Sequence, residues 1–290
     1  MKRVLITGAN SYIGTSVENW LNKEPQNFEV TTINVRGHNW KEHDFSKYDS
    51  VLHVAGIAHS DTGKANEETK QLYYKVNTEL TLEIAGKAKA EGVKQFIFLS
   101  SMIVYGESAP IGQEKIITKH TVPQPANFYG DSKLQADIGL EKLTDSNFHV
   151  AIIRPPMIYG KGSKGNYPRL AKLAKTVPFF PDIRNVRSML HIDNLCEFIK
   201  LLVEEQDEGI FHPQNKEYVT TSEMVREIGK VYNKKIVFTK IFNPVIALTS
   251  KKVELVNKVF GNSAYAQELS EYKKDYRIYD FKETVKLTEG

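Results

Sequence analysis

The sequence predicts an α/β fold in which a doubly wound parallel sheet is followed by a smaller C-terminal lobe. Three observations predict it. Short apolar stretches alternate with helical segments in the first half, a glycine-containing turn joins the first strand to the first helix, and the alternation loosens after Arg154-Pro155-Pro156. Strands separated by helices form βαβ units, which place their strands parallel in one sheet.

The elements of the predicted sheet follow one another in regular order. We expect strands at residues 4–6, 30–35, 51–54, 96–99 and 150–153, because each is a short apolar run that suits a buried strand. Residues 13–21, 67–91 and 129–143 show helical spacing, with Leu80, Ile84 and Ala88 on one face of the longest segment. Residues 1–155 therefore form the predicted sheet domain.

Residues 156–290 form mainly the predicted second lobe. Helices are expected at residues 189–205 and 222–232, and the second of these follows a Thr220-x-x-Glu223 capping pattern. Residues 246–260 form an amphipathic stretch. A strand at 209–212 can return to the sheet. The polar tail after Gly261 has no assignment from its pattern.

The composition is that of an ordinary soluble globular protein. Of 290 residues, 41% are hydrophobic and 26% are charged, and the net charge of +4 is scattered, which speaks against a nucleic-acid partner. The single cysteine, Cys196, excludes an internal disulfide and a cysteine-rich metal site, and we expect no metal. Without a membrane-length apolar run or a separate leader before the first strand, we expect no membrane partner and a cytoplasmic location.

The turn from Thr7 to Gly14 predicts a dinucleotide site. Gly8 allows a tight turn, Gly14 allows close packing of the helix on the sheet, and the helix N-terminus presents free N–H groups to a pyrophosphate. The sheet domain is thus of Rossmann type. Ser11 stands where the middle glycine of the motif is expected. The predicted contacts of this turn are Gly8, Asn10, Ser11, Tyr12, Ile13 and Gly14.

The end of the second strand predicts which cofactor binds. An acidic residue there would bind the ribose 2′-hydroxyl of NAD, whereas an arginine would bind the 2′-phosphate of NADP. The chain has Asn34 and Arg36 and no acid between them. This pattern favours NADP(H) over NAD(H). The alternative is that Arg36 is a surface charge and Asn34 binds the ribose of NAD.

Tyr129 and Lys133 lie one helical turn apart and are the predicted catalytic pair, with Ser101 as a third member. A tyrosine of ordinary pKa near ~10 is a poor acid or base, and we expect the Lys133 ammonium to lower that pKa. Ser101 follows a strand end, where the ligands of a parallel sheet gather. Tyr129 would transfer the proton, Ser101 would bind the same substrate oxygen, and Lys133 would also hold the nicotinamide ribose.

With these motifs in family order over the first two-thirds of the chain, the sequence resembles the NAD-dependent epimerase/dehydratase family of extended short-chain dehydrogenases/reductases. Other matching segments are Val51 to Gly56, Val76-Asn77, Leu99 to Gly106, Arg154-Pro155 and Arg187 to Asn194. The resemblance implies further cofactor contacts at Asp44 and Phe45 (adenine), Val54, Ala55, Gly56, Asn77 and Pro155 (nicotinamide). It also implies that Arg187 holds the substrate diphosphate, that Asn166 contacts the nucleotide sugar, and that the chain dimerises through helices 67–91 and 129–143.

The resemblance leaves two reactions open, both at C4 of a UDP-hexose or UDP-N-acetylhexosamine. Family dehydratases carry an acid pair after the serine, and here Met102 and Ile103 occupy those positions. A 4-ketoreductase would use NADPH once, and a 4-epimerase would retain NAD. Asn34 and Arg36 lead us to favour the reductase. A non-enzymatic NADP(H)-binding sensor is the alternative of another class, and a reductase of a non-sugar ketone or aldehyde is a further one.

Overall fold

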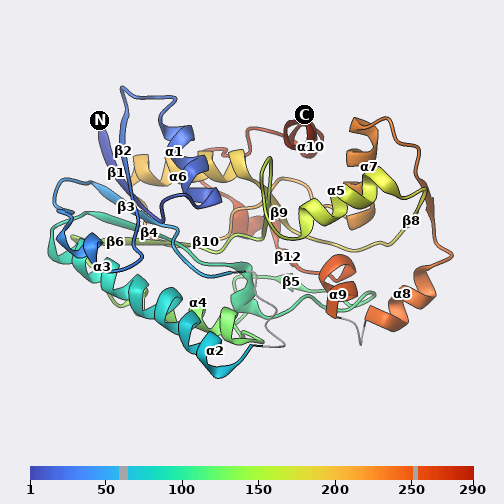
Figure 1. The fold of residues 1–290 in the computed structure, drawn as a ribbon, viewed down its shortest axis with the longest axis horizontal. Coiled ribbons are helices and arrows are strands. Elements are labelled where there is room, and N and C mark those ends of the chain that lie inside the picture. The colour runs from blue at the N-terminus through green and yellow to red at the C-terminus, as the bar shows by residue number, and fades with distance from the viewer. Residues whose placement is uncertain (59–64, 251–253) are drawn as a thin grey trace.

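A computed structural model describes residues 1–58, 65–250 and 254–290. Its centre is a six-stranded sheet in the order β10-β6-β4-β3-β1-β2, in which every pairing is parallel (Figure 1). The strands are β1 (Lys2–Thr7), β2 (Phe28–Ile33), β3 (Ser50–His53), β4 (Gln95–Leu99), β6 (His149–Ile153) and β10 (Gly209–Phe211). This architecture confirms the predicted doubly wound fold, including the return of a late strand to the sheet.

Helices cover both faces of this sheet because its strands are apolar on both sides. Val4 and Ile6 of β1 point to the layer of α1 (Tyr12–Leu21) and α6 (Ile192–Glu205). Leu5, between them, packs in the other core, beneath α3 (Leu80–Ala90) and α4 (Phe128–Glu141). Figure 1 shows the two helical layers on opposite sides of the sheet.

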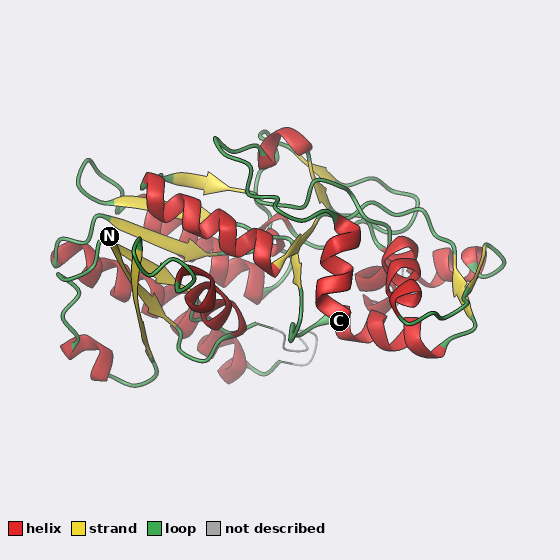
Figure 2. Ribbon diagram, turned by 90° about the horizontal axis from the view of Figure 1, so that it is seen from above, coloured by secondary structure: helices red, strands yellow, loops and turns green. Residues whose placement is uncertain are grey.

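The second lobe has its own apolar core, to which α5 (Asn166–Thr176), α7 (Thr221–Val231) and α10 (Phe281–Glu289) contribute. It also contains the strand pair β8 (Phe179–Pro181) and β11 (Val237–Thr239), and the short helices α8 (Asn243–Ser250) and α9 (Glu254–Phe260). Figures 1 and 2 place this lobe beyond the carboxyl ends of the sheet strands. The predicted domain boundary near residue 155 stays a prediction. Two elements that follow it in the chain, α6 and β10, belong to the sheet domain.

Several predicted boundaries differ from the structure. The helix expected at 189–205 begins at Ile192, because Met189–His191 forms β9 and pairs with β7 (Met157–Tyr159). His191 caps α6, accepting a hydrogen bond from the N–H of Asp193 at its Nδ1 (3.3 Å).

Two other segments are each divided between separate elements of the structure. The segment 67–91 divides into α2 (Glu67–Tyr74), a π-helical turn (Lys75–Glu79) and α3. The amphipathic stretch 246–260 falls on α8 and α9, and its residues 251–253 lie outside the described part of the chain. In the part of the chain that the structure describes, no helix has the length and apolarity that a membrane crossing requires.

Candidate active site

The glycine turn between β1 and α1 has the geometry of a phosphate cradle. Gly8 adopts φ 120°, and a Cβ there would come within 2.9 Å of the Ala55 nitrogen. Ser11 is the N-cap of α1, and its Oγ accepts the N–H of Gly14 at 3.1 Å. A Cβ on Gly14 would lie 3.2 Å from the Gly8 oxygen, so the helix approaches the turn closely. The turn therefore fits a dinucleotide pyrophosphate at a helix N-terminus.

A cavity of about 1400 Å³ begins at this turn and crosses the carboxyl edge of the sheet to the second lobe. It exceeds the usual range for one small ligand, roughly 300–1,000 Å³, and so has room for a dinucleotide and a second nucleotide side by side. Most of the predicted cofactor contacts line this cavity, namely Gly8, Asn10, Ser11, Tyr12, Ile13, Asn34, Arg36, Val54, Ala55, Gly56, Lys133 and Pro155.

The adenine end of the cavity differs from the prediction. Among the described residues, neither Asp44 nor Phe45 lines it. Phe45 is fully buried in the core beneath α3, and Asp44 is exposed and accepts the N–H of Ser46 at 3.0 Å. The reason is a short 3₁₀ turn, Asn39–Glu42, which brings Trp40 and Lys41 to the cavity ahead of them.

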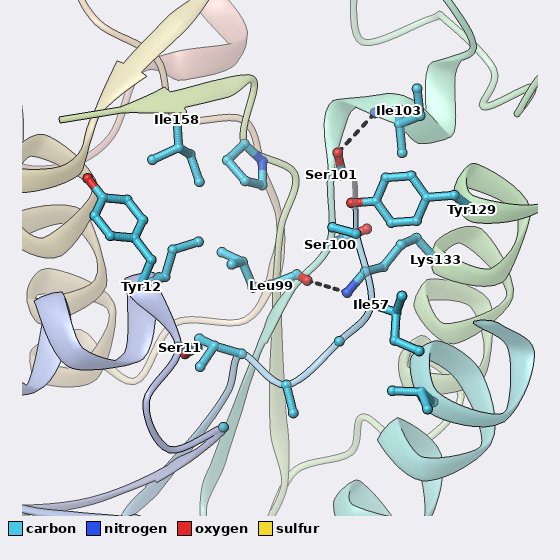
Figure 3. Close-up of a pocket in the computed structure, with 18 of the residues that line it drawn as sticks. Ser11, Tyr12, Ile57, Leu99, Ser100, Ser101, Ile103, Tyr129, Lys133 and Ile158 are labelled. Carbon is cyan, nitrogen blue, oxygen red and sulfur yellow. Dashed lines mark hydrogen bonds between the residues drawn. The ribbon is translucent and has the colours of Figure 1, made fainter. Parts of the chain in front are cut away.

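The three predicted catalytic residues come together. Ser101 follows β4, while Tyr129 and Lys133 project from α4 toward it; Figure 3 shows the Ser101 and Tyr129 hydroxyls pointing toward one another. The Lys133 ammonium donates to the Leu99 carbonyl at 2.9 Å. All three line the cavity at the strand edge, where a parallel sheet binds its ligands.

The electrostatics of this group depart from our expectation. Burial raises the pKa of Tyr129 to about 12, although a hydrogen bond with Ser101 acts in the opposite direction. Burial lowers the pKa of Lys133 to about 8. The expected lowering of the tyrosine pKa is therefore wrong for this structure, because burial disfavours the phenolate more strongly than its neighbours stabilise it. Tyr129 is therefore protonated at neutral pH.

Asn77 braces the site from the π-helical turn. Its Oδ1 accepts the N–H of Ile57 at 2.8 Å, and its Nδ2 donates to the Ile57 oxygen and the Ser132 Oγ, each at 3.1 Å. Asn77 therefore ties the loop after β3 to α4 from a fully buried position and does not itself line the cavity.

The far end of the cavity belongs to the second lobe. Arg187 and Asn166 both line it, and their roles as substrate contacts stay predictions. The Arg187 Nη1 donates to the carbonyls of Val259 (3.4 Å) and Gly261 (3.3 Å), which fixes the guanidinium at the wall. Burial lowers the pKa of Arg187 to about 10, so that it stays charged at neutral pH.

The sequence reasoning missed residues that the fold brings here from distant segments. Lys164, Asn257 and Ser263 line the same end, and only Lys164 lay in a loop that could have indicated it. The segment around Ser263 reaches this wall because its backbone pairs with distant segments of the chain. Asn262 bridges to Ala109, Ser263 bridges to Arg187, and β12 (Ala264–Tyr265) pairs with β5 (Ile116–Ile117).

A Rossmann-type sheet with a phosphate cradle, a Tyr-x-x-x-Lys helix and a serine at the strand edge defines a dinucleotide-dependent dehydrogenase/reductase of the short-chain type. The chain belongs to the NAD dependent epimerase/dehydratase family, whose model matches residues 4–215. It is therefore an enzyme of a family of NAD(P)-dependent nucleotide-sugar epimerases and reductases.

Two curated relatives are epimerases. The UDP-glucose 4-epimerase of Vibrio cholerae is 33% identical over 257 residues, covering 80% of this chain and 76% of the relative. The N-acetyl-alpha-D-glucosaminyl-diphospho-ditrans,octacis-undecaprenol 4-epimerase of Escherichia coli O157:H7 is 27% identical, covering 93% and 84%.

Solved structures share the fold. The UDP-glucuronic acid 4-epimerase of Bacillus cereus, in complex with NAD, superimposes with a TM-score of 0.74 at 17% identity, covering 98% of this chain and 96% of that one. The dTDP-4-dehydrorhamnose reductase of Bacillus anthracis, in complex with NADP, gives 0.70 at 19% identity, covering 99% and 98%.

Proposed function

We propose that this enzyme is a 4-ketoreductase that reduces the C4 ketone of a UDP-4-keto-6-deoxy-N-acetylhexosamine with NADPH. The observation that carries the proposal is the convergence of the Ser101 and Tyr129 hydroxyls in a cavity large enough for both ligands. Met102 and Ile103, which follow Ser101, offer no acid for a dehydration.

The proposed chemistry assigns each side chain one task. A dinucleotide held by the glycine turn and Lys133 would supply the hydride for C4. Tyr129, protonated at neutral pH, donates its proton to the C4 oxygen and recovers one from solvent, while the Ser101 hydroxyl hydrogen-bonds the same oxygen. Arg187 would hold the diphosphate, for which a guanidinium is suited.

We also propose a preference for NADP(H) over NAD(H), because the cavity wall after β2 is basic. Arg36 and His38 line it, as does Lys41, which is paired with Glu83 of the same cavity, and no acidic side chain stands at the strand end among residues 33–38. Arg36→Ala should weaken NADPH binding about tenfold or more, the loss of a charge-assisted hydrogen bond, and leave NADH binding nearly unchanged. Titration of both cofactors checks this, with Lys47→Ala, outside the cavity, as control. Equal losses for NADPH and NADH would contradict the preference.

A 4-epimerase is the second candidate, because both curated relatives described above are named as 4-epimerases. An epimerase would oxidise and re-reduce the same carbon without net consumption of cofactor. One of these relatives carries its sugar on a polyprenyl diphosphate, so the diphosphate at Arg187 could belong to a nucleotide or to a lipid carrier.

The decisive experiment is NADPH oxidation by the purified protein with the 4-keto sugar nucleotide, with the product sugar examined by NMR. Stoichiometric oxidation with a reduced C4 supports the reductase. Without oxidation, interconversion of UDP-glucose and UDP-galactose, or of their N-acetyl forms, would support the epimerase instead.

We propose in addition a homodimer through the layer of α2, α3 and α4. Leu72 and Ile138 are large apolar side chains exposed on those helices. Sedimentation equilibrium of the purified protein measures the oligomeric state. The cytoplasmic location is a separate expectation and stays a prediction.

A further inference from the structure

An apolar face lies at the outer end of the second lobe, far from the sheet. We name it the tip face. Its members are large hydrophobic side chains exposed to solvent, namely Phe179, Val237, Ile241, Phe242, Val245 and Leu248. Six of the fifteen large hydrophobic residues exposed in the described part of the chain thus fall on β8, on β11, on α8 and on the turn between β11 and α8, so the exposure is concentrated rather than scattered.

The local folding explains why these side chains face outward. Phe179 and Val237 are register partners in the β8–β11 pair, whereas Phe180 and Phe238, one residue on, pack into the lobe core. On α8, Ile246 packs inward, while Val245 (65% exposed) and Leu248 (71% exposed) lie three residues apart on the outer side. Both ribbon views place α8 and the strand pair at the same extremity of the molecule.

The charges around the tip face are mostly positive, although Asp182, which directly follows β8, lies 4.0 Å from Arg226. From Ile228 to Leu248 the chain contains four lysines and no acidic residue. Lys230 pairs with Glu227, but Lys234, Lys235 and Lys240 are exposed and form no ion pair with any residue that the structure describes. Although α8 itself carries no charge, an apolar surface with lysines at its border has the two features that bind proteins peripherally to anionic membranes.

We propose that the tip face docks on the surface of an anionic lipid bilayer. The exposed apolar side chains would enter the headgroup region, and the three lysines would contact lipid phosphates. A second copy of the chain fits less well, because a symmetric contact through this face would bring the same lysines of two copies together. Such peripheral docking needs no membrane-spanning helix, so it is compatible with the absence of one from the described residues.

The tip face is joined to the cavity through the next helix. Asn257 of α9 lines the cavity and donates its Nδ2 to the Ser108 oxygen at 2.7 Å. Docking would therefore hold the substrate end of the cavity near the bilayer. The inference does not depend on the proposed reaction, because vesicle binding is measured without substrate.

The test is flotation of the full chain with phosphatidylcholine vesicles that contain or lack phosphatidylglycerol. We expect binding to the anionic vesicles that weakens as salt is raised. Ile241→Glu should reduce the bound fraction about tenfold or more, as the loss of one inserted aliphatic side chain predicts. Val122→Glu is the matched control, because Val122 is 79% exposed, Ile241 is 78% exposed, and only Ile241 belongs to the tip face.

A double variant tests the contribution of the lysines to membrane binding. Lys234→Glu with Lys235→Glu leaves every apolar residue in place and should also reduce binding to anionic vesicles. Absence of wild-type binding, or equal losses in Ile241→Glu and Val122→Glu, would overturn the proposal. So would concentration-dependent self-association without vesicle binding, which would assign the face to a second copy.

Discussion

At the scale of single residues, the site depends on a tyrosine that burial keeps protonated. Tyr129→Phe removes only the hydroxyl that points toward Ser101, and the ring keeps its edge contact with Tyr73 (5.9 Å between centroids). We expect turnover to fall by roughly 10²–10⁴-fold, the usual contribution of a positioned acid, while cofactor binding changes little. Steady-state rates and cofactor titration measure the two effects. Full activity in this variant would refute the assigned proton donor.

Residue-scale prediction from sequence succeeded where spacing determines geometry. The Tyr129–Lys133 spacing on a helix and the position of Ser101 at a strand end were enough to bring the three side chains together. Prediction did not succeed where a turn redirects the chain. The 3₁₀ turn after β2 brings Trp40 to the cavity and leaves Phe45 in the core, and no periodicity in that segment indicates it.

At the scale of elements, α4 is anchored by a buried ion pair one turn beyond Lys133. The Arg154 Nε, at the end of β6, donates to the Asp137 Oδ2 at 2.9 Å, and the Arg154 Nη1 donates to the Tyr105 hydroxyl at 2.8 Å. Asp137→Asn would leave the guanidinium buried without its counter-charge. We expect it to lower the free energy of unfolding by roughly 3–5 kcal/mol, measured by urea denaturation.

Asp145→Asn serves as the control for that measurement. Asp145 pairs with Lys89 at 2.7 Å, but the two side chains are 45% and 35% exposed, so solvent screens the pair and we expect little change in stability. Similar losses in the two variants would mean that burial does not govern the strength of the Arg154–Asp137 pair.

Element boundaries were hardest to predict where a partner lies far along the chain. Met189 and Leu190 have the apolar pattern that continues into α6, yet pairing with β7 draws them into a strand. The tail after Gly261 shows a similar limit. Tyr265 is fully buried and donates its hydroxyl to the Arg154 oxygen at 2.7 Å, a contact that no local pattern reveals.

At the scale of the whole molecule, three buried histidines couple folding to pH. Burial lowers the pKa of His53 to about 3 and the pKa values of His191 and His212 to about 4. Above their unfolded pKa of about 6.5, both states are neutral and the full stability is present. As pH falls below that value, only the unfolded chain takes up these protons, so the free energy of unfolding decreases by up to about 1.4 kcal/mol per pH unit for each histidine.

Urea denaturation between about pH 7 and pH 5 measures this slope, above the range in which ordinary carboxyl groups titrate. Asp137, whose pKa burial raises to about 6, offsets part of the loss because it takes up a proton in the folded state. His53→Gln should flatten the slope, and His120→Gln, at an exposed position, should not. A slope unaffected by His53→Gln would exclude this residue as a source.

The wall of the cavity built by Asn262, Ser263 and β12 has a consequence for the protein's synthesis on the ribosome. Ser101, Tyr129 and Lys133 leave the ribosome long before this segment does, and all six strands of the central sheet also precede it. Arg187, however, finds the Gly261 carbonyl and its Ser263 bridge only once the late segment has emerged. A truncated translation product that ends before Asn262 would thus contain all three reactive groups but lack one wall of the cavity. We expect such a product to be unable to bind substrate, so binding would become possible only when synthesis is nearly complete.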